Sequence, residues 1–509
     1  MREKITVIVP AVVVHNLDPH TGIPFLPHMA GHVAGMLNHL DYDVQVIDCF
    51  GIQPHQRKII NEFMILGVDE KFVAENIHSD SKIAFIYCRT IEDLFSVELI
   101  MSAIKKQRPN IKICIFENIQ TTNSFSLLHI IDYLFDKGCD AAIMGEPEKR
   151  LESIVSALLG KNPLDVITDF AYKLDGNIKI NPKGDFDNNL DDLPFPLWRK
   201  WQLQGYWDAG FAHAPIKKNT RFLPILSSRG CPYRCTFCVS PSLNPTWRMR
   251  SPKNVVDEME YFYNKMDVTD YHFSDLDPTV NDKRTKEICK ELIKRNLPIE
   301  WKLSQGTKIE TIKDIETLEL MKRSGLTFFS FSPESGSPDL MMKLNKPFDY
   351  DHALIIAENL NRLKIKSQAC FIAGTPEETV VDQQLSVDYV KKLVKAGVDE
   401  IAVYIYSPIP GSALADQVSG FNHFSELTRS PVWREDYKQL KKYRKKMYLT
   451  FLIYKFVYYP LKVLSEISRI ISKNFQTKME MSIYKYIKLR ILKHYPSLFR
   501  KNKRLIINP

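Results

Sequence analysis

Three of the chain's nine cysteines fall within eight positions of one turn-rich segment, residues 227–241. Cys231, Cys235 and Cys238 follow the spacing Cys-x3-Cys-x2-Cys, and an aromatic residue, Phe237, directly precedes the third. Structural zinc sites usually need a fourth Cys or His, and none lies close by in the sequence. Three thiolates on one loop instead suit a 4Fe–4S cluster with one iron left open to another ligand. A zinc site and three purely structural cysteines are the alternatives.

The segments around these cysteines predict the scaffold that positions them. From residue 221 to 420, short apolar runs alternate with stretches of helical periodicity, giving six strand–helix units. An eight-fold barrel usually needs ~250 residues, so we expect a partial, TIM-like (β/α)6 barrel. Polar or small residues follow the predicted strands: Asp275, Gln305, Glu334, Gly374 and Pro410. The cysteine loop follows the first strand, which places it on the same rim.

The first 165 residues predict a different α/β unit. Continuous β-branched runs such as "ITVIVP", "KIAFIYC" and "IKICIFE" are separated by helical stretches. This pattern is typical of a parallel, Rossmann-type sheet covered on both faces, which binds ligands beyond the carboxyl ends of its strands. Residues 166–220 contain a section rich in Asp, Asn and Pro, and we expect them to form a linker.

The charge of the chain is concentrated at its end. Residues 441–509 hold 18 Lys or Arg and 2 acidic residues, whereas the whole chain has a net charge of +9. We expect residues 421–509 to form a basic, amphipathic helical region that adsorbs to an anionic membrane face. A tail packed on the barrel with solvated charges is the alternative, and nucleic-acid binding is less favoured because no nucleic-acid module accompanies it. Its longest uncharged run, residues 447–454, is too short to span a bilayer.

The cysteine spacing and the partial barrel resemble the radical S-adenosylmethionine (SAM) superfamily. The resemblance implies that Cys231, Cys235 and Cys238 bind three irons, while the amino and carboxylate groups of SAM chelate the fourth. Reductive cleavage of SAM then gives a 5′-deoxyadenosyl radical. "SPESGS" resembles the strand-end motif that contacts SAM, and "FIAGTPEET" and "FSDLDPTVN" resemble two further strand-end motifs. The implied cofactor-binding residues are Phe237, Asp275, Gln305, Glu334, Ser335 and Gly374.

The first domain resembles the cobalamin-binding domain that precedes the barrel in one class of these enzymes, which includes methylases and oxidative cyclases. Thr121, Thr122 and Gly145 would line a groove for the nucleotide tail. Two departures are visible: no Asp-x-His-x-x-Gly motif is present, and the usual glycine pair is replaced by "FENIQTT", with Glu117 and Asn118. A degenerate domain that does not bind cobalamin is the alternative.

The resemblance implies an enzyme with a small or lipid-linked hydrophobic substrate and a flavodoxin- or ferredoxin-type electron donor. Methyl transfer through cobalamin is the leading hypothesis. Cobalamin-independent cyclisation or rearrangement, and a non-catalytic scaffold that keeps the cluster, are the alternatives. The few, scattered cysteines and the lack of a signal-peptide pattern predict a cytoplasmic protein, with a peripheral position on the inner membrane face.

Overall fold

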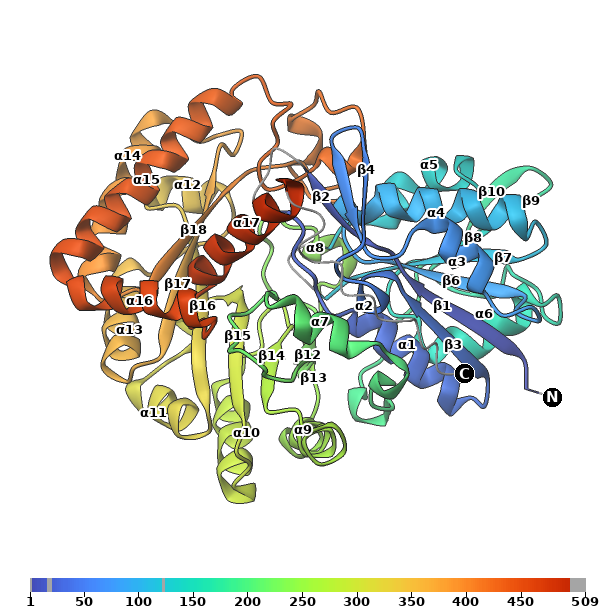
Figure 1. The fold of residues 1–509 in the computed structure, drawn as a ribbon, viewed down its shortest axis with the longest axis horizontal. Coiled ribbons are helices and arrows are strands. Elements are labelled where there is room, and N and C mark those ends of the chain that lie inside the picture. The colour runs from blue at the N-terminus through green and yellow to red at the C-terminus, as the bar shows by residue number, and fades with distance from the viewer. Residues whose placement is uncertain (1, 16–20, 121–123, 495–509) are drawn as a thin grey trace.

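The computed structural model describes residues 2–15, 21–120 and 124–494. Two lobes lie side by side, and Figure 1 shows the first lobe in blue to cyan and the second in green to orange. The first lobe contains a seven-stranded sheet in the order β10-β9-β8-β7-β6-β1-β3. Its strands are β1 (Lys4–Val9), β3 (Asp43–Asp48), β6 (Ile83–Cys88), β7 (Lys112–Glu117), β8 (Ala141–Ile143), β9 (Phe170–Leu174) and β10 (Asn177–Ile180).

Within this sheet the neighbouring strands β3, β1, β6, β7 and β8 are parallel, as the Rossmann-type prediction requires. Helices α1 (His28–His39) and α6 (Leu151–Leu158) pack on one face of the sheet. Helices α3 (Glu70–Asn76), α4 (Leu94–Gln107) and α5 (Ile131–Asp136) pack on the other face. Every residue of β6 is therefore buried, which explains the continuous apolar run.

The sheet extends beyond the predicted boundary at residue 165. Strands β9 and β10 form an antiparallel hairpin that pairs with β8, so part of the expected linker belongs to the first lobe. Asp175 and Gly176 form its turn with φ of 50° and 80°. An Asp-Gly pair between alternating residues favours such a two-residue turn, and this signal in the sequence was missed. A small sheet of β2 (Val12–His15), β5 (Phe63–Leu66) and β4 (Arg57–Ile60) was also not predicted.

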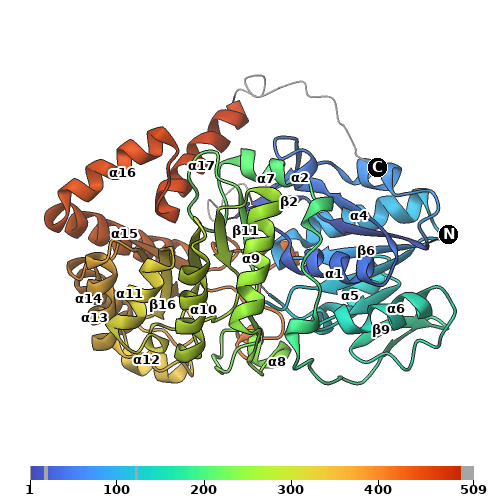
Figure 2. The same cartoon turned by 90° about the horizontal axis from the view of Figure 1, so that it is seen from below.

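The second lobe is the predicted partial barrel, with six parallel strands in the order β11-β14-β15-β16-β17-β18. The strands are β11 (Phe222–Ile225), β14 (Asp270–Phe273), β15 (Glu300–Thr307), β16 (Leu326–Glu334), β17 (Lys366–Ala373) and β18 (Glu400–Ile405). Helices around it are α9 (Pro252–Met266), α10 (Asp282–Arg295), α11 (Ile315–Arg323), α12 (Pro338–Lys343), α13 (Tyr350–Arg362) and α14 (Val380–Lys395). Figure 2 shows several of these helices along the outside of the lobe.

Short elements join the lobes. Helices α2 (Cys49–Ile52) and α7 (Leu203–Ala209) pack together, and Tyr206 donates a hydrogen bond to the buried Asp48 carboxylate at 3.1 Å. The cysteine loop is bracketed by a two-stranded ladder, β12 (Ser228–Arg229) and β13 (Arg248–Met249), and contains α8 (Ser240–Leu243). These connections hold the carboxyl edge of the first sheet beside the rim of the barrel.

Three helices form the C-terminal region: α15 (Tyr437–Tyr458), α16 (Pro460–Ser472) and α17 (Lys478–His494). Helix α15 packs along α14 and against β18, and α17 reaches the first lobe, where Lys485 donates to the Thr21 carbonyl. Among the described residues, no helix has the length and apolar character needed to cross a membrane.

Candidate functional site

The cysteine loop lies at the carboxyl end of the barrel strands. Its backbone is held on two sides: Cys231 N donates to the Asn244 carbonyl at 3.1 Å, and Thr236 N donates to the Leu344 carbonyl at 3.0 Å. All three thiols are partly exposed. Burial, with the neighbouring thiols adding to it, raises the pKa of Cys231 to about 12 and that of Cys238 to about 11. These thiols must release their protons to bind a metal.

The glycine before the first cysteine has a steric reason. Gly230 has φ of 80°, and a Cβ there would lie 2.1 Å from the Thr246 carbonyl oxygen. The chain therefore folds back tightly on itself immediately before Cys231, which only a residue without a side chain allows.

Asp275 lies beneath the start of this loop. Its carboxylate accepts hydrogen bonds from Ser227 N at 3.0 Å, Ser227 Oγ at 2.8 Å and Ser228 Oγ at 2.6 Å. Arg284 donates to the Ser227 carbonyl beside it. This geometry makes Asp275 a positioning residue for the loop, and its predicted contact with a cofactor stays a prediction.

Asp277 lies two residues further along, in the segment that follows β14. It is buried and accepts hydrogen bonds from Thr279 and from Lys308 N. Burial raises the pKa of Asp277 to about 6. Its charge also contributes to raising the pKa of Cys231.

Glu334 ends β16 on the same rim and has a strained backbone, with φ of 57°. Its Oε1 atom lies 2.5 Å from Lys346 Nζ, which also donates to the Ser332 carbonyl at 2.8 Å. The ammonium lies 6.0 Å from the centre of the Phe237 ring. Burial disfavours the charged lysine, but Glu334 outweighs this and raises the pKa of Lys346.

A carboxylate that holds an ammonium beside the thiols is the contact that the amino group of SAM requires. The structure thus brings Glu334 and Phe237 together through Lys346, and their contact with SAM stays a prediction. Lys346 was missed, because its place beside Glu334 follows from the turn after α12, which spacing alone does not define.

Three other predicted residues have structural partners. Ser335 is buried, and its Oγ lies 3.1 Å from Ser386 Oγ. Gln305 is buried near the carboxyl end of β15. Gly374 has φ of 78°, and a Cβ there would lie 2.5 Å from Leu440 of α15, so the packing of α15 already requires glycine at this position. Their contact with SAM stays a prediction.

A cavity of about 240 Å³ opens at the carboxyl edge of the first sheet. Gly145 and Arg150 of the first lobe line it, together with Phe186 of the connecting segment and with Ser242 and Leu243 of α8 in the cysteine loop. Gly145 thus borders a cavity, as its predicted role requires. Thr121 and Thr122 lie outside the described residues.

Glu117, which stands where a glycine was expected, ties two strand-end loops together. It is buried and accepts from Leu127 N at 2.8 Å and from Gly145 N at 2.7 Å. Burial raises the pKa of Glu117 to about 7. Asn118 donates to the Arg89 carbonyl at 3.0 Å. Both departures from the glycine pair therefore have internal partners at the edge of the cavity.

A buried ion cluster joins this edge to the cysteine loop. Arg229, two residues before Cys231, lies 3.2 Å from Glu146 and 2.6 Å from Glu148. Arg248 pairs with Glu146 from the other strand of the ladder at 2.5 Å. Because the acidic partners belong to the first lobe, the loop is anchored directly to the edge of the first sheet.

In the described parts of the chain, no three His, Cys, Asp or Glu side chains are arranged to hold a single metal ion. A 4Fe–4S cluster has a different requirement, because each cysteine binds its own iron. Three thiols on one glycine-hinged loop, beside an ammonium–carboxylate pair, fit that group.

Residues 225–390 match the sequence profile of the Radical SAM superfamily. Residues 225–390 are thus a radical SAM domain, and the chain is a radical SAM enzyme, a class that uses a 4Fe–4S cluster and SAM.

Relatives by sequence are named as methyltransferases and as cyclases. An uncharacterised methyltransferase of Pyrococcus horikoshii is 25% identical over 324 residues, covering 62% of this chain and 67% of that protein. Cytidylyl-2-hydroxyethylphosphonate methyltransferase of Streptomyces wedmorensis is 24% identical over 421 residues, covering 75% and 76%. The anaerobic magnesium-protoporphyrin IX monomethyl ester cyclase of Rubrivivax gelatinosus is 28% identical over 306 residues, covering 58% and 53%.

Two solved structures share the fold. The radical SAM methyltransferase TsrM from Kitasatospora setae, solved with cobalamin and a 4Fe–4S cluster, has a TM-score of 0.63 at 14% identity, covering 82% of this chain and 78% of TsrM. The cobalamin-dependent SAM radical enzyme OxsB, solved with aqua-cobalamin and SAM, has a TM-score of 0.60 at 16% identity, covering 97% and 67%. These likenesses concern the arrangement of the two lobes.

Proposed function

We propose that this radical SAM enzyme transfers a methyl group through cobalamin to an unactivated carbon. The observation that carries the proposal is the cavity between the lobes, which is lined both by the carboxyl edge of the first sheet and by residues of α8 in the cysteine loop. A cofactor held there lies beside the rim on which SAM is cleaved. The names of the methyltransferase relatives and of TsrM support the same reaction, and the titles of TsrM and OxsB support the use of cobalamin.

The cavity fits part of a corrinoid. Its volume of about 240 Å³ is below that of a site for a drug-sized ligand, so it suits the nucleotide tail rather than the whole cofactor. A Cβ at Gly145 would meet only Arg150 Nη2, at 3.9 Å, which leaves the wall open there. When bound, methylcobalamin supplies the methyl group.

The chain's own side chains then have separate tasks. We propose that Cys231, Cys235 and Cys238 hold the cluster, that Glu334 accepts from the amino group of SAM, and that Phe237 packs beside it. Lys346 now occupies the carboxylate of Glu334. The amino group of SAM keeps N–H donors when it is bound to iron, and we expect it to compete with Lys346 for this carboxylate. Gln305, Ser335 and Gly374 shape the same rim.

We also propose a small or lipid-linked hydrophobic substrate, a flavodoxin- or ferredoxin-type electron donor, and a cytoplasmic enzyme that works at the inner face of a membrane. We keep the proposed bounds of the barrel, residues 221–420, and of the C-terminal region, residues 421–509. The first lobe is extended through β10.

The first experiment is anaerobic purification with cobalamin supplied, followed by iron, sulfide and corrinoid analysis and a SAM-cleavage assay. About four irons, a corrinoid and both deoxyadenosine and S-adenosylhomocysteine support the proposal. Deoxyadenosine without a corrinoid overturns methyl transfer and favours cyclisation or rearrangement, for which the cyclase relative is a precedent in name. A protein without iron overturns the cluster assignment.

Two pairs of variants sharpen this test. Cys235→Ser is expected to lose iron, whereas Cys289→Ser, at a buried cysteine of α10, is expected to keep it. Gly145→Asn narrows the cavity and is expected to lose corrinoid with its iron intact. Gly176→Asn is the control, because its φ is also positive and a Cβ there meets nothing within 4 Å. Equal corrinoid content in the two glycine variants contradicts the proposed site.

A further inference from the structure

Helix α16 packs on the barrel through its charged residues. Lys462 Nζ donates to Asn361 at 2.7 Å, to the Gly397 carbonyl at 3.0 Å and to Asp399 at 3.2 Å. Glu466, on the same face, pairs with the buried Lys455 of α15 at 2.5 Å. The charges that the sequence suggested would meet solvent or lipid are therefore turned into the protein.

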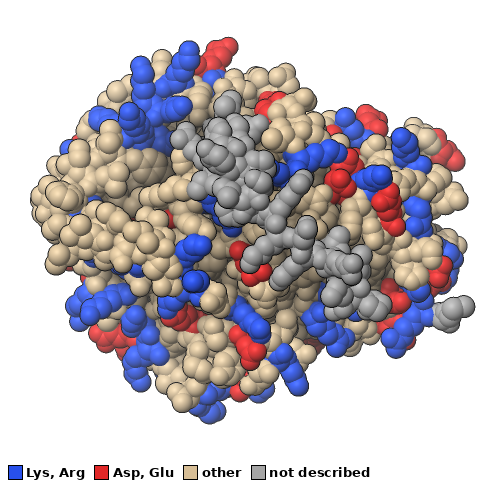
Figure 3. All heavy atoms as spheres, viewed as in Figure 1, with Lys and Arg blue, Asp and Glu red and all other residues tan. Residues whose placement is uncertain are grey.

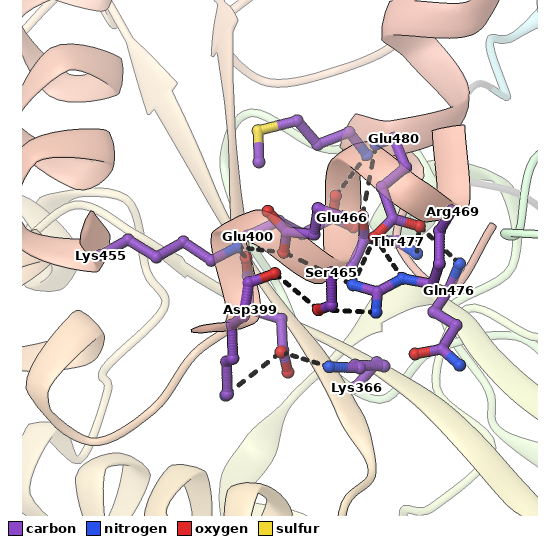
Figure 4. A network of polar contacts seen from close by, with 12 residues as sticks. Lys366, Asp399, Glu400, Lys455, Ser465, Glu466, Arg469, Gln476, Thr477 and Glu480 are labelled. Atoms are coloured by element: carbon purple, nitrogen blue, oxygen red, sulfur yellow. Dashed lines mark hydrogen bonds and ion pairs between the residues drawn. The ribbon is translucent and has the colours of Figure 1, made fainter. Parts of the chain in front are cut away.

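A further ion pair and a backbone hydrogen bond hold α16 and α17 in place. Arg469 of α16 pairs with the buried Glu480 of α17 at 2.7 Å. Glu400 of β18 accepts from Lys478 N at 2.9 Å, at the first turn of α17. Figure 4 shows these side chains converging between the barrel strands and the tail helices. If α16 turned its apolar side toward the protein, several of these buried charges would lose their partners on α16. Leaving a buried charge without its partner is costly.

The opposite side of α16 is apolar and exposed. Leu461 is 78% exposed, Leu464 60%, Ile467 53% and Ile471 77%. A surface helix of a water-soluble protein normally buries such residues and exposes its charges. Helix α16 instead buries charged residues and exposes apolar ones, so its outer side is suited to contact with an apolar medium.

The exposed apolar surface continues onto the end of α15, where Ile453, Phe456 and Val457 are also exposed. We call these three residues, with Leu461, Leu464, Ile467 and Ile471, the tail face. In Figure 3 an uncharged expanse covers the left of the molecule, where α16 lies in Figure 1, and Lys and Arg side chains gather above it. The same inversion recurs on α17, where Lys485 and Lys488 are buried and Ile483 and Ile487 are exposed.

The charge around the tail face has one sign. Between residues 437 and 488 the acidic residues are Glu466 and Glu480, and both are buried in ion pairs. The first half of α15 carries exposed lysines: Lys438, Lys441, Lys442, Lys445 and Lys446. Lysines beside an apolar surface complement anionic headgroups above acyl chains.

We propose that the tail face docks on an anionic lipid bilayer, with its aliphatic and aromatic side chains at the level of the upper acyl chains and the α15 lysines among the headgroups. The inference deepens the proposed function by naming the surface at which a hydrophobic substrate is met. Only the link to a hydrophobic substrate rests on the proposed function, because the docking surface is argued from the contacts and exposure of α16.

The test is co-sedimentation of the full-length protein with vesicles of phosphatidylcholine, with or without phosphatidylglycerol. The wild type is expected to bind the anionic vesicles. Leu461→Glu/Ile471→Glu is expected to lower the partition coefficient at least about tenfold, because two charges enter the apolar layer. Val166→Glu/Leu174→Glu is the control, since both residues are exposed apolar positions on the first lobe, and it is expected to bind like the wild type.

A second variant separates charge from apolar contact. Lys441→Gln/Lys442→Gln/Lys445→Gln/Lys446→Gln is expected to lose the preference for anionic vesicles. Equal binding of the wild type and Leu461→Glu/Ile471→Glu overturns the proposal. So does a wild-type dimer in lipid-free solution that these substitutions dissociate, if neither protein binds vesicles, because a second copy then covers the tail face.

Iron and corrinoid contents are measured on the same variants. Unchanged contents in Leu461→Glu/Ile471→Glu, with vesicle binding lost, show that docking fails independently of the cofactors. A wild type that binds vesicles but lacks corrinoid refutes the proposed function and leaves the docking surface intact.

Discussion

Arg229 offers the sharpest test of how the cysteine loop is positioned. Its side chain is 4% exposed and bridges Glu146 and Glu148 of the first lobe. In Arg229→Met, Glu146 keeps Arg248, but Glu148 loses its salt bridge while its side chain stays 3% exposed. Leaving a buried charge without its partner typically costs about 3–5 kcal/mol. The loop is therefore expected to open locally about 100- to 5,000-fold more often.

Hydrogen exchange of peptides covering residues 144–151 and 227–231 measures this opening. Arg229→Met is expected to exchange much faster in both peptides and to retain less iron. Arg229→Met/Glu148→Gln removes the stranded charge and is expected to recover most of the protection. Arg221→Met is the control, because Arg221 and Asp267 form an exposed pair at 2.9 Å that contributes at most about 1 kcal/mol.

Two results would refute this reasoning. If Arg229→Met exchanges like Arg221→Met, the ion cluster does not hold the loop. If the double variant is as labile as Arg229→Met, the cost comes from lost packing of the arginine and not from the stranded carboxylate.

Three further predictions follow from the site. Gly374→Ala is expected to lower the free energy of unfolding by about 2 kcal/mol, and Leu440→Ala in the same chain to recover part of it, measured by urea denaturation; no loss would contradict the close approach of α15. Burial raises the pKa of Glu117 from 4.5 to about 7, so the folded chain keeps a proton that the unfolded chain releases, and stability falls as pH rises through this window. In Glu117→Gln the free energy of unfolding is expected to fall by about 3 kcal/mol less over this pH range than in the wild type. The same pH dependence of unfolding in both proteins would contradict this prediction. Glu334→Gln is expected to weaken SAM binding more than about tenfold with iron content unchanged, and equal affinity in equilibrium binding would move the ammonium contact elsewhere.

Much of the architecture was predictable from local pattern. The parallel strands of the first sheet coincide with the apolar runs, because parallel strands covered on both faces need apolar residues at nearly every position. The cysteine loop was predictable for a similar reason, since Cys231, Cys235 and Cys238 lie in one short segment whose spacing is itself the signal. The turn signal of the hairpin, Asp175 and Gly176, also lies in adjacent residues, although the sequence prediction did not include this hairpin.

Other features depend on residues that are distant in the chain. Arg229 meets Glu146 and Glu148 across more than 80 positions, and Gly374 is required by Leu440 of a later helix. No spacing rule links such residues, because their approach follows from how the lobes and helices pack. The same holds for Lys346, which reaches Glu334 only after α12 has reversed the chain direction.

The tail separates the two kinds of information most clearly. By itself the sequence determined that α16 has a charged and an apolar side, because helical periodicity assigns Leu464 and Ile467 to one side and Lys462 and Glu466 to others. Only the tertiary structure decided which side meets the protein. Buried partners at Asp399, Lys455 and Glu480 favour the charged side, since ion pairs between elements depend on their packing and leave no trace in the pattern of a single helix.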